Sequence, residues 1–348
     1  MTERFLPYTD ELAERIQAQC TTLFRLMQSI KVKEIGLSEH GVQYFLGSHY
    51  KRLFFSIETS AHLLYHSIRC TGKNTEDIVI MDYGAGVGSL YLLAKMIGCK
   101  KVLYNDLLEH WKDHAFLIAQ AINIDLDEWI VGDIETTLQI LQHKQIECDI
   151  ITSRNVIEHI YKLDVFYKTV HHWQPNALVY SSTTANFYNP AMNIKHVLLH
   201  KRIEKVYLQK RIQLITAHNP QLNSGQVEQL AKQTKGYNVA DLYAAVDAFV
   251  SKGTPPVKGY YYTNTCEPDW GIWAENILPF GIHKKMIRAG NMQAGFRPGF
   301  WDTHYSKPWK NVLSRGLNSL IRGLPFTGYL LAPFIYVIAL PENKNSPL

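Results

Sequence analysis

Three glycines at alternate positions form the feature of this sequence best suited to bind a ligand. They lie in the segment Asp82-Tyr83-Gly84-Ala85-Gly86-Val87-Gly88, where the missing side chains allow the backbone to approach a ligand closely. A dinucleotide-binding turn normally reads G-x-G-x-x-G, but Ser89 stands at the position of its third glycine. Asp82 would also repel a pyrophosphate held beside it. The turn is therefore predicted to hold a cationic or zwitterionic ligand.

Acids also close the next two apolar runs of the chain. Asp106 follows the run at 101–105, and Asp133 follows the run at 129–132. A further run at 148–153 leads into Arg154-Asn155-Val156-Ile157-Glu158-His159. Open α/β sheets bind ligands at the carboxyl ends of their strands. We therefore expect these polar side chains to lie together at one edge of a sheet.

The elements that must position these residues alternate between strands and helices. Strands are predicted at 78–82, 101–105, 129–132, 148–153 and 177–182, and helical patterns occupy 89–97, 110–123, 134–142 and 163–173. Such alternation predicts an α/β fold with a doubly wound parallel sheet and right-handed crossovers.

The segments around this core predict four regions. Helical patterns at 10–30 and 41–68 precede the core, and a helical insertion follows it and ends at Thr254-Pro255-Pro256. Strand patterns at 259–265, 295–303 and 334–340 come last. We therefore divide the chain into an N-terminal helical segment (1–75), an α/β core (76–186), a helical cap insertion (187–257) and a C-terminal part that completes the sheet and the substrate site (258–348).

From about Ile78 to Ser182 the sequence resembles the class I S-adenosylmethionine-dependent methyltransferases. Their first motif is an acid, one residue and G-x-G-x-G at the end of the first strand, as at Asp82 to Gly88. The resemblance implies a Rossmann-like, mostly parallel seven-stranded sheet with N-terminal helices and an inserted helical cap. It also implies S-adenosylmethionine as the cosubstrate.

The resemblance assigns roles to individual residues. Gly84, Ala85, Gly86 and Gly88 would line the methionyl and ribose parts of the cofactor, and Asp82 would support its amino end. Asp106, with Leu107 beside it, would accept hydrogen bonds from the ribose hydroxyls. Asp133 would bind the adenine amino group, and the backbone amide of Ile134 would read a ring nitrogen. Arg154 and Asn155 lie in the loop that would face the sulfonium.

Glu158 and His159 are the candidate catalytic residues. Methyl transfer is an in-line displacement, and a base is needed only when the nucleophile carries a proton, which His159 could remove. A structural or cofactor-orienting role is the alternative for this pair. Relatives with Glu-x-x-Glu-His here bind a divalent ion, but Asn155 replaces the first glutamate, and no metal is predicted.

Two further segments are candidates for ligand contacts. The aromatic run Tyr260-Tyr261-Tyr262, with Trp270 and Trp273 after it, either faces a substrate or packs in the seam between the insertion and the sheet. Tyr50 or Arg52, just before the first strand, is expected to meet the methionyl carboxylate.

Composition excludes several classes of protein. With 348 residues, 46% hydrophobic and 19% charged, the chain is a folded protein rather than a disordered one. Its five cysteines form no C-x-x-C pair, which argues against a zinc or disulfide framework. The N-terminus has no signal-peptide pattern, and the most apolar stretch, 329–340, is too short to span a membrane. We therefore expect a cytoplasmic protein.

The predicted function is methylation of a small molecule on oxygen or nitrogen, with a sugar, a lipid-linked compound or a secondary metabolite as acceptor. Nucleic acid is not expected as a partner, because the chain has no basic stripe with interleaved aromatics. Two alternatives remain: a cofactor-binding interaction module without catalysis, and a nicotinamide-dependent oxidoreductase.

Overall fold

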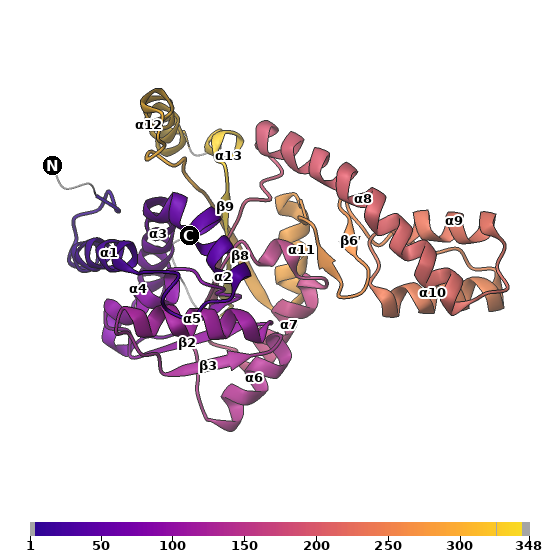
Figure 1. Cartoon of the computed structure of the whole chain (residues 1–348), viewed down its shortest axis with the longest axis horizontal. Coiled ribbons are helices and arrows are strands. Elements are labelled where there is room, and N and C mark those ends of the chain that lie inside the picture. The colour runs from indigo at the N-terminus through magenta and orange to yellow at the C-terminus, as the bar shows by residue number, and fades with distance from the viewer. Residues whose placement is uncertain (1–3, 325, 343–348) are drawn as a thin grey trace.

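Seven strands form a central sheet in the structure, a computed structural model that describes residues 4–324 and 326–342. Their order is β3-β2-β1-β4-β5-β9-β8 (Figure 1). The first five strands are parallel, whereas β9 runs antiparallel to both β5 and β8. The strands are β1 (Val79–Tyr83), β2 (Lys101–Asp106), β3 (Glu128–Val131), β4 (Ile150–Arg154), β5 (Leu178–Thr183), β8 (Met292–Pro298) and β9 (Ile335–Pro341). The mostly parallel seven-stranded sheet of the predicted fold is confirmed.

Helices cover both faces of this sheet. Successive residues of a strand point to opposite faces, so neighbouring strand residues pack against different helices. One face is covered by α1 (Glu11–Ser29), α3 (Leu53–Thr71), α4 (Leu90–Met96) and α5 (Glu109–Ala121), and the other by α6 (Ile134–His143), α7 (Leu163–Trp173) and α11 (Phe280–Ala289). Ile80 belongs to the apolar core on the first face, whereas its neighbour Met81 belongs to the core on the second.

The N-terminal helices pack against the first face. Asp10 caps α1 (Glu11–Ser29), since its side chain accepts a hydrogen bond from the Ala13 N–H at 3.1 Å. The helix predicted over 41–68 is interrupted: α2 (Glu39–Tyr44) and α3 (Leu53–Thr71) are separated by a π-helix (Phe45–His49) and a 3₁₀ turn (Tyr50–Arg52). Gly47, a weak helix former, lies in the interruption.

The helical insertion is an arm rather than a cap. It consists of α8 (Pro190–His218), α9 (Ser224–Gln233) and α10 (Val239–Lys252), which have a small apolar core of their own and extend away from the sheet (Figure 1). The beginning of α8 lies at the sheet edge, where the His196 ring contacts the Thr184 carbonyl at 3.2 Å. The beginning of α10 reaches the loop after β4, because Asp241 accepts a hydrogen bond from the Tyr161 hydroxyl at 2.7 Å. With 29 residues, α8 is about 44 Å long, and it carries the rest of the arm away from the sheet.

The strand predicted at 259–265 is wrong. This segment is irregular, and only two short strands, β6 (Cys266–Glu267) and β7 (Ile272–Trp273), form a hairpin after it. The Asn264 side chain donates to Asn276 Oδ1 at 2.7 Å and to the Ile277 carbonyl at 3.0 Å. Tertiary hydrogen bonds of this kind replace the strand pairing that the alternating pattern suggested.

The C-terminal part completes the sheet with a shifted strand and adds unpredicted helices. β8 lies at 292–298 instead of 295–303, and after it the Gly299 N–H donates to the Phe334 carbonyl at 2.9 Å. Helix α11 had no predicted counterpart, nor had α12 (Pro308–Gly323) and α13 (Gly328–Leu331). Among the described residues, no helix combines the length and the apolar character needed to cross a membrane.

Candidate functional site

A cavity of about 500 Å³ lies at the carboxyl edge of β1, β2 and β4. Its wall contains the loop after β1 and residues that follow β2, β3 and β4. Of the predicted cofactor residues it contains Asp82, Gly84, Ala85, Gly86, Gly88, Asp106, Leu107, Asp133, Arg154 and Asn155. Residues from four separate motifs therefore meet at the edge where the sequence placed them.

The loop after β1 adopts a conformation that requires glycine. Gly84 and Gly86 have positive φ angles of 66° and 53°, which other residues adopt only at a cost. A Cβ atom on Gly84 would lie 2.7 Å from a methyl group of Val156. The Tyr104 hydroxyl donates to the Gly86 carbonyl at 3.0 Å and fixes the far side of the loop. The bare backbone of the loop thus lies directly against the cavity.

Asp82 and Arg154 form a pair of opposite charges at the base of the cavity. The Asp82 carboxylate is buried and accepts a hydrogen bond from the Tyr91 N–H at 3.1 Å. Burial raises the pKa of Asp82 to about 7, although the nearby Arg154 guanidinium acts to lower it. Arg154 Nη1 donates to the Ser56 carbonyl at 2.6 Å and to Thr59 Oγ1 at 3.0 Å. Arg154 therefore joins the end of β4 to helix α3.

Asp106 organises the neighbouring part of the wall. Its Oδ2 accepts from the Gly86 N–H and its Oδ1 from the Leu108 N–H, both at 3.0 Å. Burial raises the pKa of this carboxyl group, and these backbone hydrogen bonds oppose the shift. Each carboxylate oxygen has a second lone pair, so Asp106 can accept further hydrogen bonds from a ligand.

Asp133 lines the cavity, but Ile134 does not. Asp133 is the N-cap of α6 and accepts a hydrogen bond from the Thr136 N–H at 2.9 Å. Ile134 follows it as the first residue of α6 and is not among the residues that line the cavity. The contact of its amide with a ligand ring stays a prediction.

The loop after β4 presents Asn155 and His159 differently from the prediction. Asn155 has a left-handed backbone with φ of 57°, and only a short 3₁₀ turn (Ile157–His159) follows it. Asn155, Glu158 and His159 therefore lie on no common helix face, although positions i, i+3 and i+4 would be neighbours on a helix. His159 lines the cavity, and its Nδ1 lies 2.8 Å from the Trp273 carbonyl. Since a carbonyl only accepts, Nδ1 carries a proton, and Nε2 of the neutral ring is left as an acceptor.

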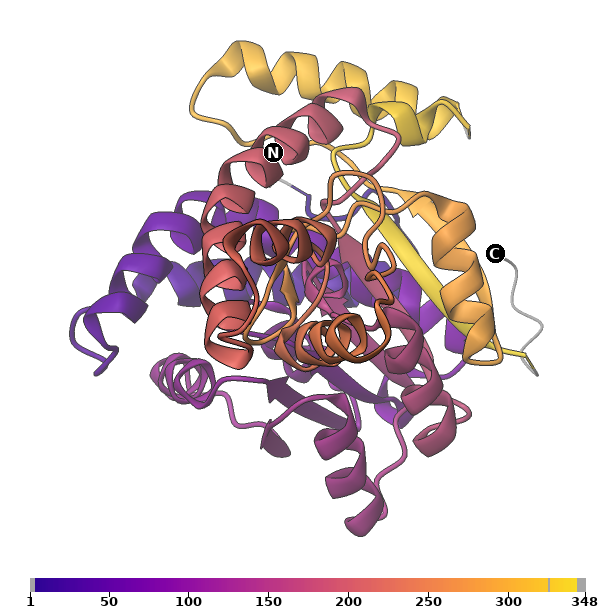
Figure 2. The same ribbon diagram turned by 90° about the vertical axis from the view of Figure 1, so that its right-hand side faces the viewer.

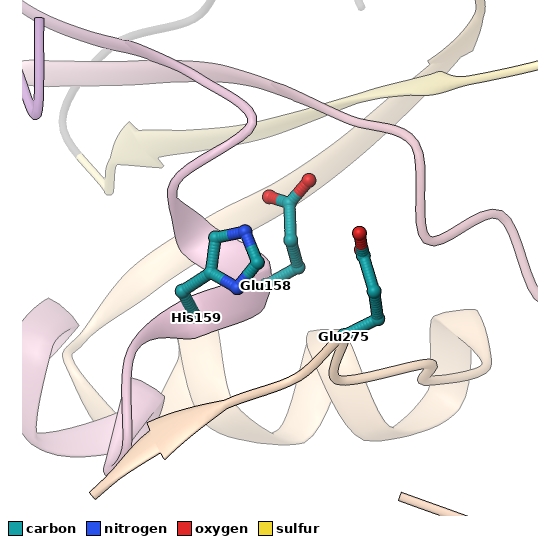
Figure 3. Close-up of side chains that lie close together, drawn as sticks. All are labelled: Glu158, His159 and Glu275. Carbon is teal, nitrogen blue, oxygen red and sulfur yellow. The ribbon is translucent and has the colours of Figure 1, made fainter. Parts of the chain in front are cut away.

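Beside His159, the carboxylates of the buried Glu158 and the partly buried Glu275 lie close together (Figure 3). Glu158 is 3% exposed and does not line the cavity, and its Oε1 accepts from the Thr184 N–H at 3.3 Å. Among the described residues, its Oε2 and the Oε2 of Glu275 have no hydrogen-bond partner. Burial raises the pKa of Glu158, and burial together with the Glu158 charge raises the pKa of Glu275 to about 7.

The same three residues have the donor atoms of a metal site. One ligand atom each from Glu158, His159 and Glu275 lies within 4.8 Å of the other two. Oxygen and imidazole donors suit several divalent ions. The cluster can thus take up either a proton or a cation to offset the charges of two neighbouring carboxylates. Glu275 was not predicted, because it lies on a distant loop with no local motif around it.

Aromatic residues from distant segments complete the cavity wall. Tyr44 of α2 and Trp111 of α5 both line it, with their ring centroids 4.8 Å apart. On the opposite side Trp270, Gly271 and Ile272 of the β6–β7 hairpin line it. Only Trp270 had been singled out in the sequence, on the basis of the aromatic density around it.

The residues of two further predicted ligand contacts do not line this cavity. The Tyr50 hydroxyl donates to the Gln28 carbonyl at 3.2 Å, and Arg52 pairs with Asp302 at 3.2 Å, and neither residue lines the cavity. The Tyr260 ring packs under Lys235 and Lys258 instead of facing the cavity. Tyr260 therefore lies in the seam between the arm and the sheet, which was the alternative for the run, whereas Trp270 lines the cavity.

Comparison with solved structures finds methyltransferases. An S-adenosylmethionine-dependent methyltransferase from Mesorhizobium loti is 13% identical, with 80% of this chain and 97% of that chain covered and a TM-score of 0.36. Magnesium protoporphyrin IX methyltransferase from Synechocystis, with bound S-adenosylhomocysteine, is 12% identical, with coverage of 86% and 96% and a TM-score of 0.36. All these values are low, and the fold of this chain is defined by its own strand order. No protein-family model and no curated protein matches the chain.

Proposed function

We propose that this chain is an S-adenosylmethionine-dependent methyltransferase that acts on a small molecule. The observation that carries the proposal is the cavity at the carboxyl edge, where a glycine loop, two buried carboxylates and the partly buried guanidinium of Arg154 line the same space. When bound, S-adenosylmethionine supplies an electrophilic methyl group. The residues of the chain supply binding, orientation and a place for a proton.

The charges of the cavity fit a zwitterionic ligand. Asp82 and Arg154 are close enough to influence each other's pKa, and burial disfavours the charged form of each. An ammonium group near Asp82 and a carboxylate near Arg154 would compensate both charges. A methionyl end carries these two groups, whereas a pyrophosphate would meet the carboxylates of Asp82 and Asp106.

Asp106 and Asp133 fit the hydroxyl and amino groups of a nucleoside. Asp106 keeps acceptor capacity on both oxygens after its two backbone contacts. Asp133 uses one oxygen as a helix cap and has the other available. Tyr44 and Trp111 provide aromatic surfaces on the same wall, suited to a planar base.

His159 is the proposed catalytic base. Its Nδ1 proton is held by the Trp273 carbonyl, so that Nε2 can accept a proton from an acceptor hydroxyl or amine. The carboxylates of Glu158 and Glu275 would stabilise the imidazolium that results. Glu158 therefore acts as a positioning residue in this proposal, because its buried side chain does not reach the cavity.

The size of the cavity supports a small acceptor. About 500 Å³ lies within the range of small-molecule sites. At the end that bears His159, the wall is formed by Tyr161, Trp270 and Ile272. These side chains suit a compact acceptor with an apolar or ring-shaped body.

Calorimetric titration tests the proposal. S-adenosylmethionine and S-adenosylhomocysteine should each bind, and NAD should give no heat of binding. Tight NAD binding without a response to either sulfur compound would instead assign the cavity to an oxidoreductase.

A second titration tests the role of His159. If Nε2 is available for a proton, Mn²⁺ should not bind measurably at the cluster of Glu158, His159 and Glu275. Paramagnetic resonance of added Mn²⁺ should therefore be the same for the native chain and Glu275→Gln. Tight Mn²⁺ binding that this variant abolishes would make the cluster a metal site and remove the base from the mechanism.

A further inference from the structure

Helix α12 places its polar residues against the body of the protein. Asn318 exchanges two hydrogen bonds with the Trp301 backbone, at 2.7 and 2.8 Å, and Asn311 exchanges two with the Tyr305 backbone, at 2.7 and 2.9 Å. Ser314 and Ile321 are buried on the same side. The spacing of these four residues, at 311, 314, 318 and 321, is that of one helix face.

The opposite face of α12 is apolar and exposed. Trp309 is 62% exposed, Val312 67%, Leu313 56% and Leu320 50%. Leu324 and Phe326, which follow the helix, are exposed as well. A helix in a globular protein normally buries its apolar stripe, so this helix has the reverse orientation. An apolar stripe of this kind marks a surface that another partner covers.

Basic residues accompany the exposed stripe, and acids do not. Lys307, Lys310, Arg315 and Arg322 lie on or beside α12, and the sequence has no Asp or Glu from Thr303 to Pro341. None of these four bases has an ion pair with a carboxylate in the described part of the chain. Arg315 and Arg322 also line, with Arg297, a cavity of about 940 Å³.

The beginning of α8 extends this surface. Both views place α12 and the start of α8 at the same end of the molecule (Figures 1 and 2). Ile194 and Leu198 of α8 are 62% and 61% exposed, and Lys195 and Lys201 are exposed beside them. Apolar and basic side chains thus alternate over two helices.

We propose that this face docks on the surface of a membrane that contains anionic lipids, with α12 lying in the plane of the interface. Amphipathic helices with apolar residues on one face and Lys or Arg beside them bind in this way, because burial of the apolar face and attraction to anionic headgroups add. A second copy of the chain fits less well, since like charges of two such faces would oppose each other. The proposal rests on α12 and α8 and is independent of the chemistry at the carboxyl edge.

Vesicle co-sedimentation tests this proposal. The native chain should bind vesicles of phosphatidylcholine with phosphatidylglycerol, and it should bind pure phosphatidylcholine vesicles much more weakly. Raising the salt concentration to 0.5 M should weaken the binding, because the Debye length falls to roughly 4 Å.

The double variant Leu313→Asp/Leu320→Asp should reduce vesicle binding by roughly tenfold or more, since two buried apolar contacts are lost and two like-charge repulsions appear. The matched control is Val250→Asp, because Val250 is also about half exposed but lies on α10 of the arm. Unchanged thermal unfolding and unchanged calorimetric titration with S-adenosylhomocysteine would show that the double variant is folded.

Two results would overturn the proposal. The first is equal vesicle binding by the native chain and the double variant. The second is a stable dimer in light scattering that the double variant abolishes, which would make a second copy the occupant of the face.

Discussion

The cavity edge and helix α12 both reverse the usual distribution of side chains, in opposite senses. At the cavity edge, polar groups are buried: Asp82 and Asp106 lie within the fold and accept hydrogen bonds from backbone N–H groups. On α12, apolar side chains such as Trp309 and Leu313 are exposed. The burial of the polar groups is largely compensated by hydrogen bonds within the chain. The exposure of the apolar side chains, in contrast, is compensated only by contact with a partner outside the chain.

This difference separates two kinds of functional surface. A buried polar group has a cost that its own hydrogen bonds must offset, so the cavity edge must be built rigidly before a ligand arrives. An exposed apolar group has almost no effect on folding and becomes favourable only on contact with a partner. Changes at the cavity edge should therefore affect both stability and ligand binding, while changes on the outer face of α12 should affect only association.

Gly84→Ala should have the largest effect, because it disturbs the loop that holds the polar groups in place. The new side chain would take a positive φ and meet Val156 at 2.7 Å, with an expected cost of about 3 kcal/mol in unfolding free energy. Calorimetric titration should show S-adenosylmethionine binding weakened by about 100-fold or more. Gly281→Ala is the matched control, since nothing lies within 4 Å of a Cβ atom there. Equal effects of the two changes would contradict the strained loop.

Asp106→Ala should weaken S-adenosylhomocysteine binding by about 1.5 to 3 kcal/mol, because hydrogen bonds to a charged acceptor are lost. It should also lower the unfolding free energy, since the N–H groups of Gly86 and Leu108 lose their acceptor. Calorimetry and chemical denaturation measure the two effects. Asp125→Ala, at an exposed position before β3, should change neither. Unchanged binding by Asp106→Ala would remove Asp106 from the proposed site.

The parts of this edge that sequence could predict are those with a local pattern. Each of the strands β1 to β5 contains a short apolar run, and an acid lies in or within two residues of the end of each of the first three. This local pattern predicts both the strands and their polar ends. Glu275, Tyr44 and Trp111 belong to the site only because the chain folds back on itself. No neighbouring residues mark them, and their proximity follows from tertiary packing alone.

Helix α12 was missed for a different physical reason. Sequence reasoning assumes that an apolar stripe is buried, but Asn311 and Asn318 bind the body of the protein through specific hydrogen bonds. The strand predicted at 259–265 failed similarly, because Asn264 and its neighbours satisfy their polar groups with tertiary contacts. In both places particular hydrogen bonds outweigh the hydrophobic pattern.

His283 is a further buried polar group, and no hydrogen bond from the described residues offsets the burial of its ring. Its ring lies on α11 and is buried near Phe296 of β8, neither nitrogen has a hydrogen-bond partner in the described part of the chain, and burial lowers the pKa to about 4. The unfolded chain binds a proton near pH 6.5, which the folded chain does not, so stability is present above pH 6.5 and is lost as the pH falls toward 4. At pH 5 the loss from this residue should be about 2 kcal/mol.

Denaturation of the native chain and of His283→Leu at pH 7.5 and pH 5 measures this contribution. The variant should lose less stability over the same interval, by the amount that His283 contributes. Identical pH dependence of the two proteins would mean that the His283 ring has a partner or is not buried.

Leu320→Ser should have the smallest effect, because its side chain is on the outer face of α12, half exposed. We expect a change in unfolding free energy within about 0.5 kcal/mol, together with weaker binding to anionic vesicles. Ile321→Ser, one residue further and buried, should cost about 2 to 4 kcal/mol, because apolar contacts are lost and a hydroxyl is buried. Thermal unfolding of the two variants compares the faces of one helix directly. A large loss for Leu320→Ser would show that its side chain is buried within the folded chain, and the outer face of α12 would then need no partner.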